Sequence, residues 1–304
     1  MKITAQTQTL TTAEAPGLAE KSWPAVLADL IKARLTLLVL LTTLVGFYVG
    51  FRGPMDYLLM FHTLLGTALV ASGAAALNQL LERDLDARMR RTAGRPLPSG
   101  RMTPGSVQLF GVACSVIGLA YLALAVNVTT SLIGAVSLLL YLFVYTPLKR
   151  VTWVNTLVGA IPGGLPPLMG WTAARGEVTV GGWSLFAILA LWQLPHFMAI
   201  AWLYREEYAK AGFVMLPLVD ADGRRTGRQA VSHTLALLPV SLSPYVLGLT
   251  GRTYCFGALV LGLAFLWCAV KFARELTPQR ARQLFFLSIV YLPLLLGLMV
   301  LDKQ

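Results

Sequence analysis

An apolar run meets a strongly charged segment in residues 57–97, which read YLLMFHTLLGTALVASGAAALNQLLERDLDARMRRTAGRPL. The run over 57–82 exceeds the ~20 residues that a membrane-spanning helix needs. Eight charged side chains then follow between Glu82 and Arg95. The whole chain shows the same contrast, because 56% of its 304 residues are hydrophobic and only 13% are charged. Since soluble proteins carry roughly 25% charged residues, the sequence predicts an all-α, polytopic membrane protein.

Apolar runs of similar length recur along the chain and predict nine transmembrane helices. We expect residues 26–304 to form a single transmembrane domain, because no convincing internal repeat divides them. Residues 1–25 are polar and lack the apolar core of a signal peptide, so we interpret them as a disordered cytoplasmic tail. The nine predicted spans are 30–51, 57–82, 104–124, 128–146, 153–173, 182–204, 231–249, 253–272 and 281–301.

Positive charge is distributed unevenly between the loops. With the N-terminus in the cytoplasm, only Arg52, Arg175, Arg252 and Lys303 of the 25 Lys and Arg residues lie on the opposite side. Cytoplasmic loops of membrane proteins are enriched in these residues. The pattern therefore predicts a cytoplasmic N-terminus and a C-terminus on the opposite side. It also accounts for the net charge of +11 without a nucleic-acid partner.

An amide and two carboxylates recur every four residues at the end of the second span. Asn78, Glu82 and Asp86 would share one face of a continuous helix, while Asp84 would point nearly the opposite way. Oxygen ligands of this kind suit Mg²⁺, which often completes its shell with water and substrate phosphates. The spacing therefore predicts a metal site at the membrane surface.

Arginines follow these acids directly, with Arg91 and Arg95 spaced by four. Guanidinium groups bind phosphate in a bidentate geometry. A polybasic loop that only sets topology and contacts anionic lipid would explain the arginines. It would not explain two acids and an amide in register beside the membrane, where ionisable groups are costly. The combination favours a bound diphosphate.

A second polar stripe follows the sixth span. His196, Tyr204 and Tyr208 recur at multiples of four residues, and Glu207 lies on the same face, about 16 Å from His196 along a continuous helix. A histidine inside the bilayer can instead be satisfied by a hydrogen bond between helices. The sequence leaves both interpretations of His196 open.

The loop YTPLKR at 145–150 adds further candidates between the fourth and fifth spans. Tyr145, Lys149 and Arg150 could contact phosphate or carboxylate groups. The two basic residues could equally serve only to fix topology.

These motifs together resemble those of a known family. The pattern N-x-x-x-E-x-x-x-D followed by RRTAGRPLPSG, together with YTPLKR, is similar to motifs of the UbiA superfamily of membrane prenyltransferases. The segments WVNTLVGAIPGGLPPLMGW, WQLPHFMAIAW and REEYAKAG resemble its heme-farnesylating branch more closely. The resemblance covers about residues 28–300. It implies nine helices around a central cavity that opens to the cytoplasm and laterally to lipid.

The resemblance also implies a reaction. In the heme branch, farnesyl diphosphate alkylates a vinyl group of heme B with Mg²⁺ as cofactor, and water addition completes heme O. This would occur in the bacterial inner membrane, and an association with a heme A synthase or a terminal oxidase assembly stays open. One alternative is a prenyltransferase for an aromatic acceptor such as 4-hydroxybenzoate. A transporter or lipid-binding protein is less favoured, because transporters place their binding groups near the bilayer midplane.

The resemblance implies site roles for the residues of this chain that match the family's motifs. Asn78, Glu82 and Asp86 would act as metal ligands and catalytic residues, and His196 would be catalytic. Where many family members have D-x-x-x-D, this chain has Tyr204 and Tyr208. Either Glu206 and Glu207 bind a second metal, or a single Mg²⁺ and additional basic residues hold the diphosphate. The predicted binding residues for diphosphate or heme are Arg91, Arg95, Tyr145, Lys149, Arg150, Tyr204, Arg205, Tyr208 and Lys210.

Overall fold

The computed structural model describes residues 21–304, and within that range all named elements are helices. Most of the predicted tail lies outside the described residues, although a helix already begins at Trp23. The helices are α1 (Trp23–Leu30), α2 (Ala33–Gly50), α3 (Tyr57–Leu81), α4 (Arg83–Asp86), α5 (Pro104–Ala125), α6 (Val128–Leu139), the π-helix η1 (Leu140–Tyr145), α7 (Thr146–Leu148), α8 (Asn155–Arg175), α9 (Val180–Leu203), α10 (Arg205–Ala211), α11 (Leu216–Val219), α12 (Arg224–Val246), α13 (Arg252–Glu275) and α14 (Pro278–Leu301).

Seven of the predicted spans are long and apolar enough to cross a membrane. They are α2, α3, α5, the continuous segment Val128–Leu148, α9, α13 and α14. The two other predicted spans correspond to α8 and α12, which have 21 and 23 residues but a less apolar composition. Glycines and three prolines make α8 less apolar, and two arginines at the start of α12 do the same there. The chain is an integral, multi-pass membrane protein.

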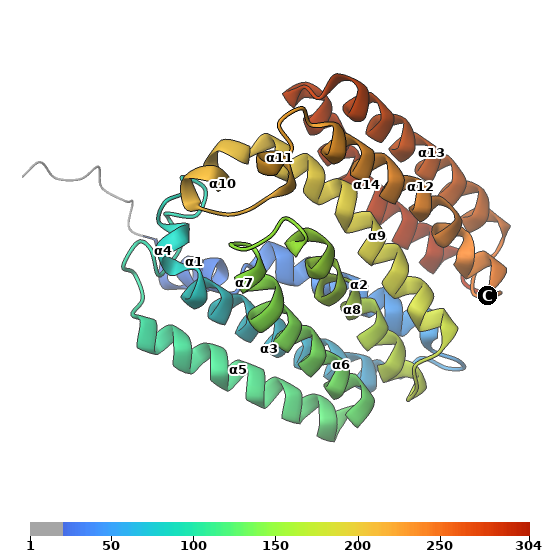
Figure 1. The fold of residues 1–304 in the computed structure, drawn as a ribbon. Helices are drawn as coiled ribbons and strands as arrows, with labels where there is room; N and C mark the ends of the chain where they lie inside the picture. The colour runs from blue at the N-terminus through green and yellow to red at the C-terminus, as the bar shows by residue number, and fades with distance from the viewer. Residues whose placement is uncertain (1–20) are drawn as a thin grey trace, which may run out of the picture.

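The long helices form a bundle in which neighbours in sequence usually pack together (Figure 1). Helix α3 packs against α5, α8 against α9, and α12 against α13. Contacts of α2 with α8 and of α14 with both α2 and α9 join the two halves of the chain. The short helices α4, α10 and α11 gather at one end of the bundle (Figure 1). This arrangement brings the charged segments after α3 and α9 to the same end.

Glycines allow α2 and α8 to approach closely. A Cβ atom at Gly46 would strike the backbone of Pro167, and one at Gly170 would strike the backbone of Thr43 and Phe47. Small residues at helix contacts are a common means of association in membranes, where lipid is as apolar as the side chains. The two glycines therefore fix the distance between these helices along one side of the bundle.

Prolines in α8 release backbone carbonyl groups inside the membrane. Pro166 has no N–H group, so the carbonyl oxygen of Pro162 loses its usual helical donor. The Ser137 hydroxyl donates a hydrogen bond to this oxygen over 3.1 Å. Because no water is available in the bilayer core, such replacement partners let a proline-containing helix persist there.

A π-helical turn shapes the end of the fourth span. Residues Leu140–Tyr145 form η1, and π-helical turns often occur at functional sites. The rings of Tyr141 and Tyr145 stack with centroids 5.7 Å apart. Both side chains line the interior of the bundle.

Candidate active site

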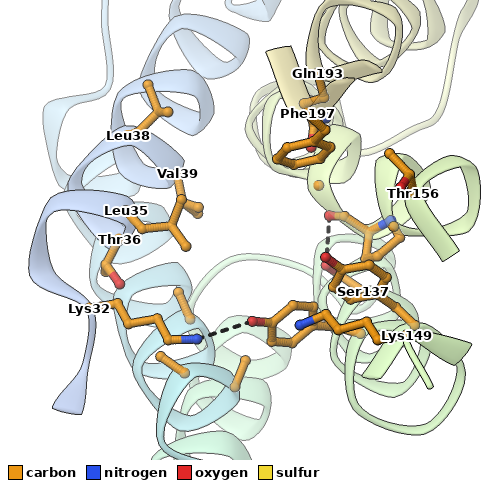
Figure 2. A pocket seen from close by; sticks show the side chains of 18 of the residues that line it. Lys32, Leu35, Thr36, Leu38, Val39, Ser137, Lys149, Thr156, Gln193 and Phe197 are labelled. Carbon is orange, nitrogen blue, oxygen red and sulfur yellow. Dashed lines mark hydrogen bonds between the residues drawn. The ribbon is translucent and has the colours of Figure 1, made fainter. Parts of the chain in front are cut away.

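A cavity of about 430 Å³ lies between α2, α3, α6, η1, α8 and α9. Lys32 and Lys149 lie at one end of this cavity (Figure 2). Farther along, Leu38 and Val39 of α2 lie across from Phe197 of α9 (Figure 2). The cavity thus has a charged end and apolar walls, which suits a ligand with a charged head and a long hydrocarbon chain.

Two buried carboxylates stand at the charged end. The Glu82 side chain accepts a hydrogen bond from Lys149 Nζ at 2.8 Å, and Asp86 accepts one from Arg95 at 2.5 Å. Glu82 is 4% exposed and Asp86 is 1% exposed. Each ion pair engages one carboxylate oxygen, Oε1 of Glu82 and Oδ2 of Asp86. The second oxygen of each carboxylate can serve as a hard oxygen ligand for a cation.

Local chain reversal explains how Arg95 reaches Asp86. Helix α3 ends at Leu81 and α4 ends at Asp86. The Thr92 hydroxyl then donates to the Asp86 carbonyl oxygen over 2.7 Å and holds the following turn. The segment after this turn brings the Arg95 guanidinium back beside the Asp86 carboxylate.

The two carboxylates differ in acidity. Burial alone would raise the pKa of Glu82, but the charge and hydrogen bond of Lys149 outweigh it and lower the pKa. At Asp86 burial prevails over the Arg95 charge and raises the pKa. Burial opposes charge on Lys149 as well, yet Tyr145 and Glu82 beside it raise its pKa. Glu82 and Lys149 therefore remain ionised more readily than the Asp86 carboxylate does.

Asn78 is fully buried but does not line the cavity. Its Oδ1 accepts a hydrogen bond from Lys32 Nζ at 2.6 Å, and its Nδ2 donates to Thr146 Oγ1 at 3.1 Å. The four-residue spacing continues past the end of α3, because the Glu82 N–H donates to the Asn78 carbonyl oxygen and the Asp86 N–H donates to the Glu82 carbonyl oxygen. Of the three predicted ligands, Glu82 and Asp86 line the cavity. In this arrangement Asn78 orients other side chains.

Lys32 is a site residue that the sequence prediction missed. Its ammonium group lies 3.4 Å from the Tyr141 hydroxyl and 2.6 Å from Asn78 Oδ1. Its backbone has φ 50° and ψ 55°, a left-handed conformation that is uncommon outside glycine and often found at functional sites. Burial, followed by the charges of Arg95 and Lys149, lowers its pKa to about 7. In the sequence, nothing distinguishes Lys32 from any other lysine near the start of a predicted span.

Three loops converge around this charged end. The Val214 N–H donates to the Lys149 carbonyl oxygen at 2.7 Å, and Asn155 Nδ2 donates to the Val214 carbonyl oxygen at 2.8 Å. Met89 packs in one apolar cluster with Phe213 and Met215. These contacts connect the segments after α3, α7 and α10, which lie far apart in the sequence.

The other predicted binding residues divide into two groups. Arg91, Tyr145 and Tyr208 line the cavity, with the Arg91 guanidinium 5.7 Å from the centroid of the Tyr204 ring. The Lys149 ammonium lies 4.5 Å from the centroid of the Tyr145 ring. Residues of the second group are exposed and do not line the cavity; they are Arg150, Tyr204, Arg205 and Lys210.

The candidate ligands of the predicted second metal lie outside the cavity lining. Glu206 is exposed, Glu207 is half-buried, and neither lines the cavity. Within residues 21–304, no three His, Cys, Asp or Glu side chains form a group that could hold a metal ion. The donor set that fits Mg²⁺ is therefore the pair of Glu82 and Asp86, since this ion commonly uses one or two carboxylates plus substrate phosphates.

His196 lines the cavity farther from the charged end. Its Nδ1 lies 2.7 Å from the Ser288 hydroxyl of α14. The imidazole ring stacks on Trp192 and on Phe285, with centroids 5.1 Å apart in both cases. This hydrogen bond joins α9 to α14, as one of the two interpretations of His196 predicts. The structure shows that His196 also lines the cavity.

Comparison with known proteins identifies the family. The sequence profile of the UbiA prenyltransferase family matches residues 39–290. The chain belongs to this family. Protoheme IX farnesyltransferase of Solibacter usitatus (strain Ellin6076) is 52% identical over 284 residues, which cover 90% of this chain and 97% of that protein. The human mitochondrial protoheme IX farnesyltransferase is 40% identical, and the match covers 92% of this chain and 63% of that protein.

Solved structures share the fold at lower identity. A structure of digeranylgeranylglyceryl phosphate synthase has a TM-score of 0.78 at 16% identity, with 92% of this chain and 98% of that chain covered. A UbiA homolog from Archaeoglobus fulgidus bound to DMAPP and Mg²⁺ has a TM-score of 0.64 at 17% identity, covering 90% and 98%. The predicted UbiA membership, the all-α membrane fold and prenyltransferase activity are confirmed, and the relatives' names agree with the predicted heme-farnesylating branch.

Proposed function

We propose that this prenyltransferase transfers the farnesyl group of farnesyl diphosphate to a vinyl group of protoheme IX, giving heme O and diphosphate. The names of relatives that are 40–52% identical over most of the chain support this reaction. The observation that carries the proposal is the cavity, in which two buried carboxylate–cation pairs close one end of an apolar chamber.

Glu82 and Asp86 would hold Mg²⁺ at the charged end. When bound there, the ion neutralises negative charge on the leaving diphosphate. Arg95 and Lys149 already lie beside these carboxylates, and Lys32 and Arg91 also face the cavity. These four cations would bind the remaining diphosphate oxygens, since fixed charges aimed at a leaving group stabilise the transition state.

The reaction needs no strong base for carbon–carbon bond formation. The C1–O bond of farnesyl diphosphate breaks, and its electron pair leaves with the diphosphate. The π-electron pair of the vinyl group then forms the new carbon–carbon bond to C1. Water adds to the resulting cation on the porphyrin side chain and releases one proton. The apolar walls around Leu38, Val39 and Phe197 would exclude water until that last step.

The charge distribution supports a cytoplasmic position for the charged end. Lys32, Arg91, Arg95 and Lys149 all lie there, and cytoplasmic loops are enriched in Lys and Arg. Farnesyl diphosphate and Mg²⁺ would then enter from the cytoplasm of a bacterial-type inner membrane. Heme O released into the membrane would be available to a heme A synthase or a terminal oxidase assembly.

Product analysis tests the proposal. Purified protein in detergent or lipid nanodiscs is incubated with heme B, farnesyl diphosphate and Mg²⁺, and the porphyrins are analysed by mass spectrometry. We expect a product heavier than heme B by one farnesyl group and one hydroxyl group, together with released diphosphate. A parallel reaction contains 4-hydroxybenzoate in place of heme. Prenylation of that acceptor without any heme product would support the aromatic alternative and contradict heme farnesylation.

A further inference from the structure

Ser288 of α14 connects to two aromatic side chains of α9. Its hydroxyl lies 2.7 Å from His196 Nδ1, and its carbonyl oxygen accepts a hydrogen bond from Trp192 Nε1 at 2.8 Å. The serine is fully buried. One residue thus fixes the positions of both rings, which also stack on each other.

The hydrogen bonds of Ser288 determine the tautomer of His196. The Ser288 hydroxyl has one hydrogen, and it lies 2.6 Å from the carbonyl oxygen of Phe285, which can only accept. If that hydrogen pointed to His196 instead, two unprotonated oxygens would face each other at this distance. The hydroxyl therefore donates to Phe285 and accepts from His196. In the neutral imidazole this places the proton on Nδ1 and leaves a lone pair on Nε2.

The opposite ring nitrogen is available to a ligand. Across the part of the chain that the structure describes, no hydrogen bond to His196 Nε2 is recorded. The atom is not fully enclosed by the protein, so a ligand can reach it. His196 itself lines the chamber in which the substrates would lie. Stacking on Trp192 and Phe285 holds the plane of the ring.

We propose that Ser288 is a positioning residue that holds His196 in its Nδ1–H tautomer, so that Nε2 ligates the iron of the porphyrin substrate. The identity of that porphyrin rests on the proposed function. Metal-binding histidines almost always donate their other ring N–H group to a fixed partner, which orients the ring and strengthens the ligand. An axial histidine is a common way to hold heme iron. Since His196 lies farther along the cavity than the charged end, the iron–histidine bond would hold the porphyrin in the chamber that adjoins the site where the farnesyl group is released.

Heme titration followed by absorption spectroscopy tests this proposal without catalysis. The wild-type protein, without farnesyl diphosphate or Mg²⁺, is titrated with ferric heme B, and we expect the spectrum of a histidine-ligated heme. His196→Ala removes that spectrum, and added imidazole restores it. Ser288→Ala weakens heme affinity by roughly tenfold, the lower end of the effect of removing such a partner. Ser288→Thr keeps the hydroxyl and most of the affinity.

Ser241 offers a matched control. It is also fully buried, and its hydroxyl bonds to the carbonyl oxygen three residues earlier, as that of Ser288 does. Within residues 21–304 it makes no hydrogen bond to a histidine. We expect Ser241→Ala to leave the heme spectrum and affinity unchanged. Equal effects of Ser241→Ala and Ser288→Ala, or a histidine-ligated spectrum in His196→Ala without imidazole, would overturn the proposal.

The product assay separates this inference from the proposed function. If the wild-type protein yields heme O while His196→Ala keeps the wild-type heme spectrum, iron ligation is wrong and heme farnesylation stands. If histidine-ligated heme is observed but no farnesylated heme forms, the assigned reaction is wrong and the iron ligand remains.

Discussion

The segments after α3 and after α9 look alike in sequence but lie differently in the structure. Both follow an apolar span and carry acidic and basic residues. The first buries Glu82 and Asp86 against the cavity, whereas the second leaves Glu206 exposed and contributes Tyr208 to the cavity wall. Charged residues near a membrane surface thus become a site only where the backbone turns them inward.

Asp86→Asn should abolish turnover, with a loss of at least about 100-fold, because a metal ligand at the leaving group is lost. The measurement is the rate of heme O formation by purified protein, with circular dichroism to show that the variant is folded. Asp84→Asn is the control, since Asp84 is exposed and pairs with Arg83. Retention of more than about a tenth of wild-type turnover in Asp86→Asn would remove that residue from the metal role.

Lys149→Met should destabilise the protein by about 3–5 kcal/mol, because the buried Glu82 carboxylate loses its partner. Adding Glu82→Gln should recover much of that stability but none of the activity. Thermal unfolding in detergent and steady-state kinetics measure the two effects separately. Arg150→Met is the control, since Arg150 is exposed. Equal destabilisation by the Lys149 and Arg150 substitutions would show that the Glu82 ion pair does not stabilise the site.

Lys32→Met should raise the KM for farnesyl diphosphate by about tenfold, as expected when one charge-assisted hydrogen bond to phosphate is lost. The KM for heme should change little. Arg34→Gln provides a nearby exposed comparison. A KM for farnesyl diphosphate that stays within twofold of wild type would exclude Lys32 from diphosphate binding.

Glu206→Gln should give the smallest effect, a change in turnover of less than about twofold, because the side chain is exposed and away from the cavity. The same rate assay, run across a range of Mg²⁺ concentrations, measures this. A tenfold loss, or a strongly raised Mg²⁺ requirement, would show that the second segment supplies a metal ligand after all.

Most of the side chains that line the charged end are among the residues predicted from the sequence. Four-residue spacing identified Glu82 and Asp86, and the motif over 145–150 identified Tyr145 and Lys149. The sequence could not show that Asn78 bonds to Lys32 and Thr146 and does not line the cavity. Four-residue spacing places side chains along one face of a helix, but it does not show which of them lie against a cavity.

The same limit applies to the second stripe. Helix α9 ends at Leu203 and α10 begins at Arg205, and of this stripe His196 and Tyr208 line the cavity, whereas Tyr204 and Glu207 do not. Lys32 and Ser288 could not be identified from the sequence for another reason. Their roles arise from contacts with Asn78 and His196, which are 46 and 92 residues away. A periodic pattern among neighbouring residues cannot predict contacts between residues so far apart in the sequence.

Binding of farnesyl diphosphate to the heme-free protein tests the central claim most directly. Isothermal titration with and without Mg²⁺ compares the wild-type protein with the double variant Glu82→Gln/Asp86→Asn. Wild-type binding should depend on Mg²⁺ and disappear with a chelator, and the double variant should show no Mg²⁺-dependent gain in affinity. An equal Mg²⁺-dependent gain in both proteins would contradict the assignment of these two carboxylates as the metal-binding pair.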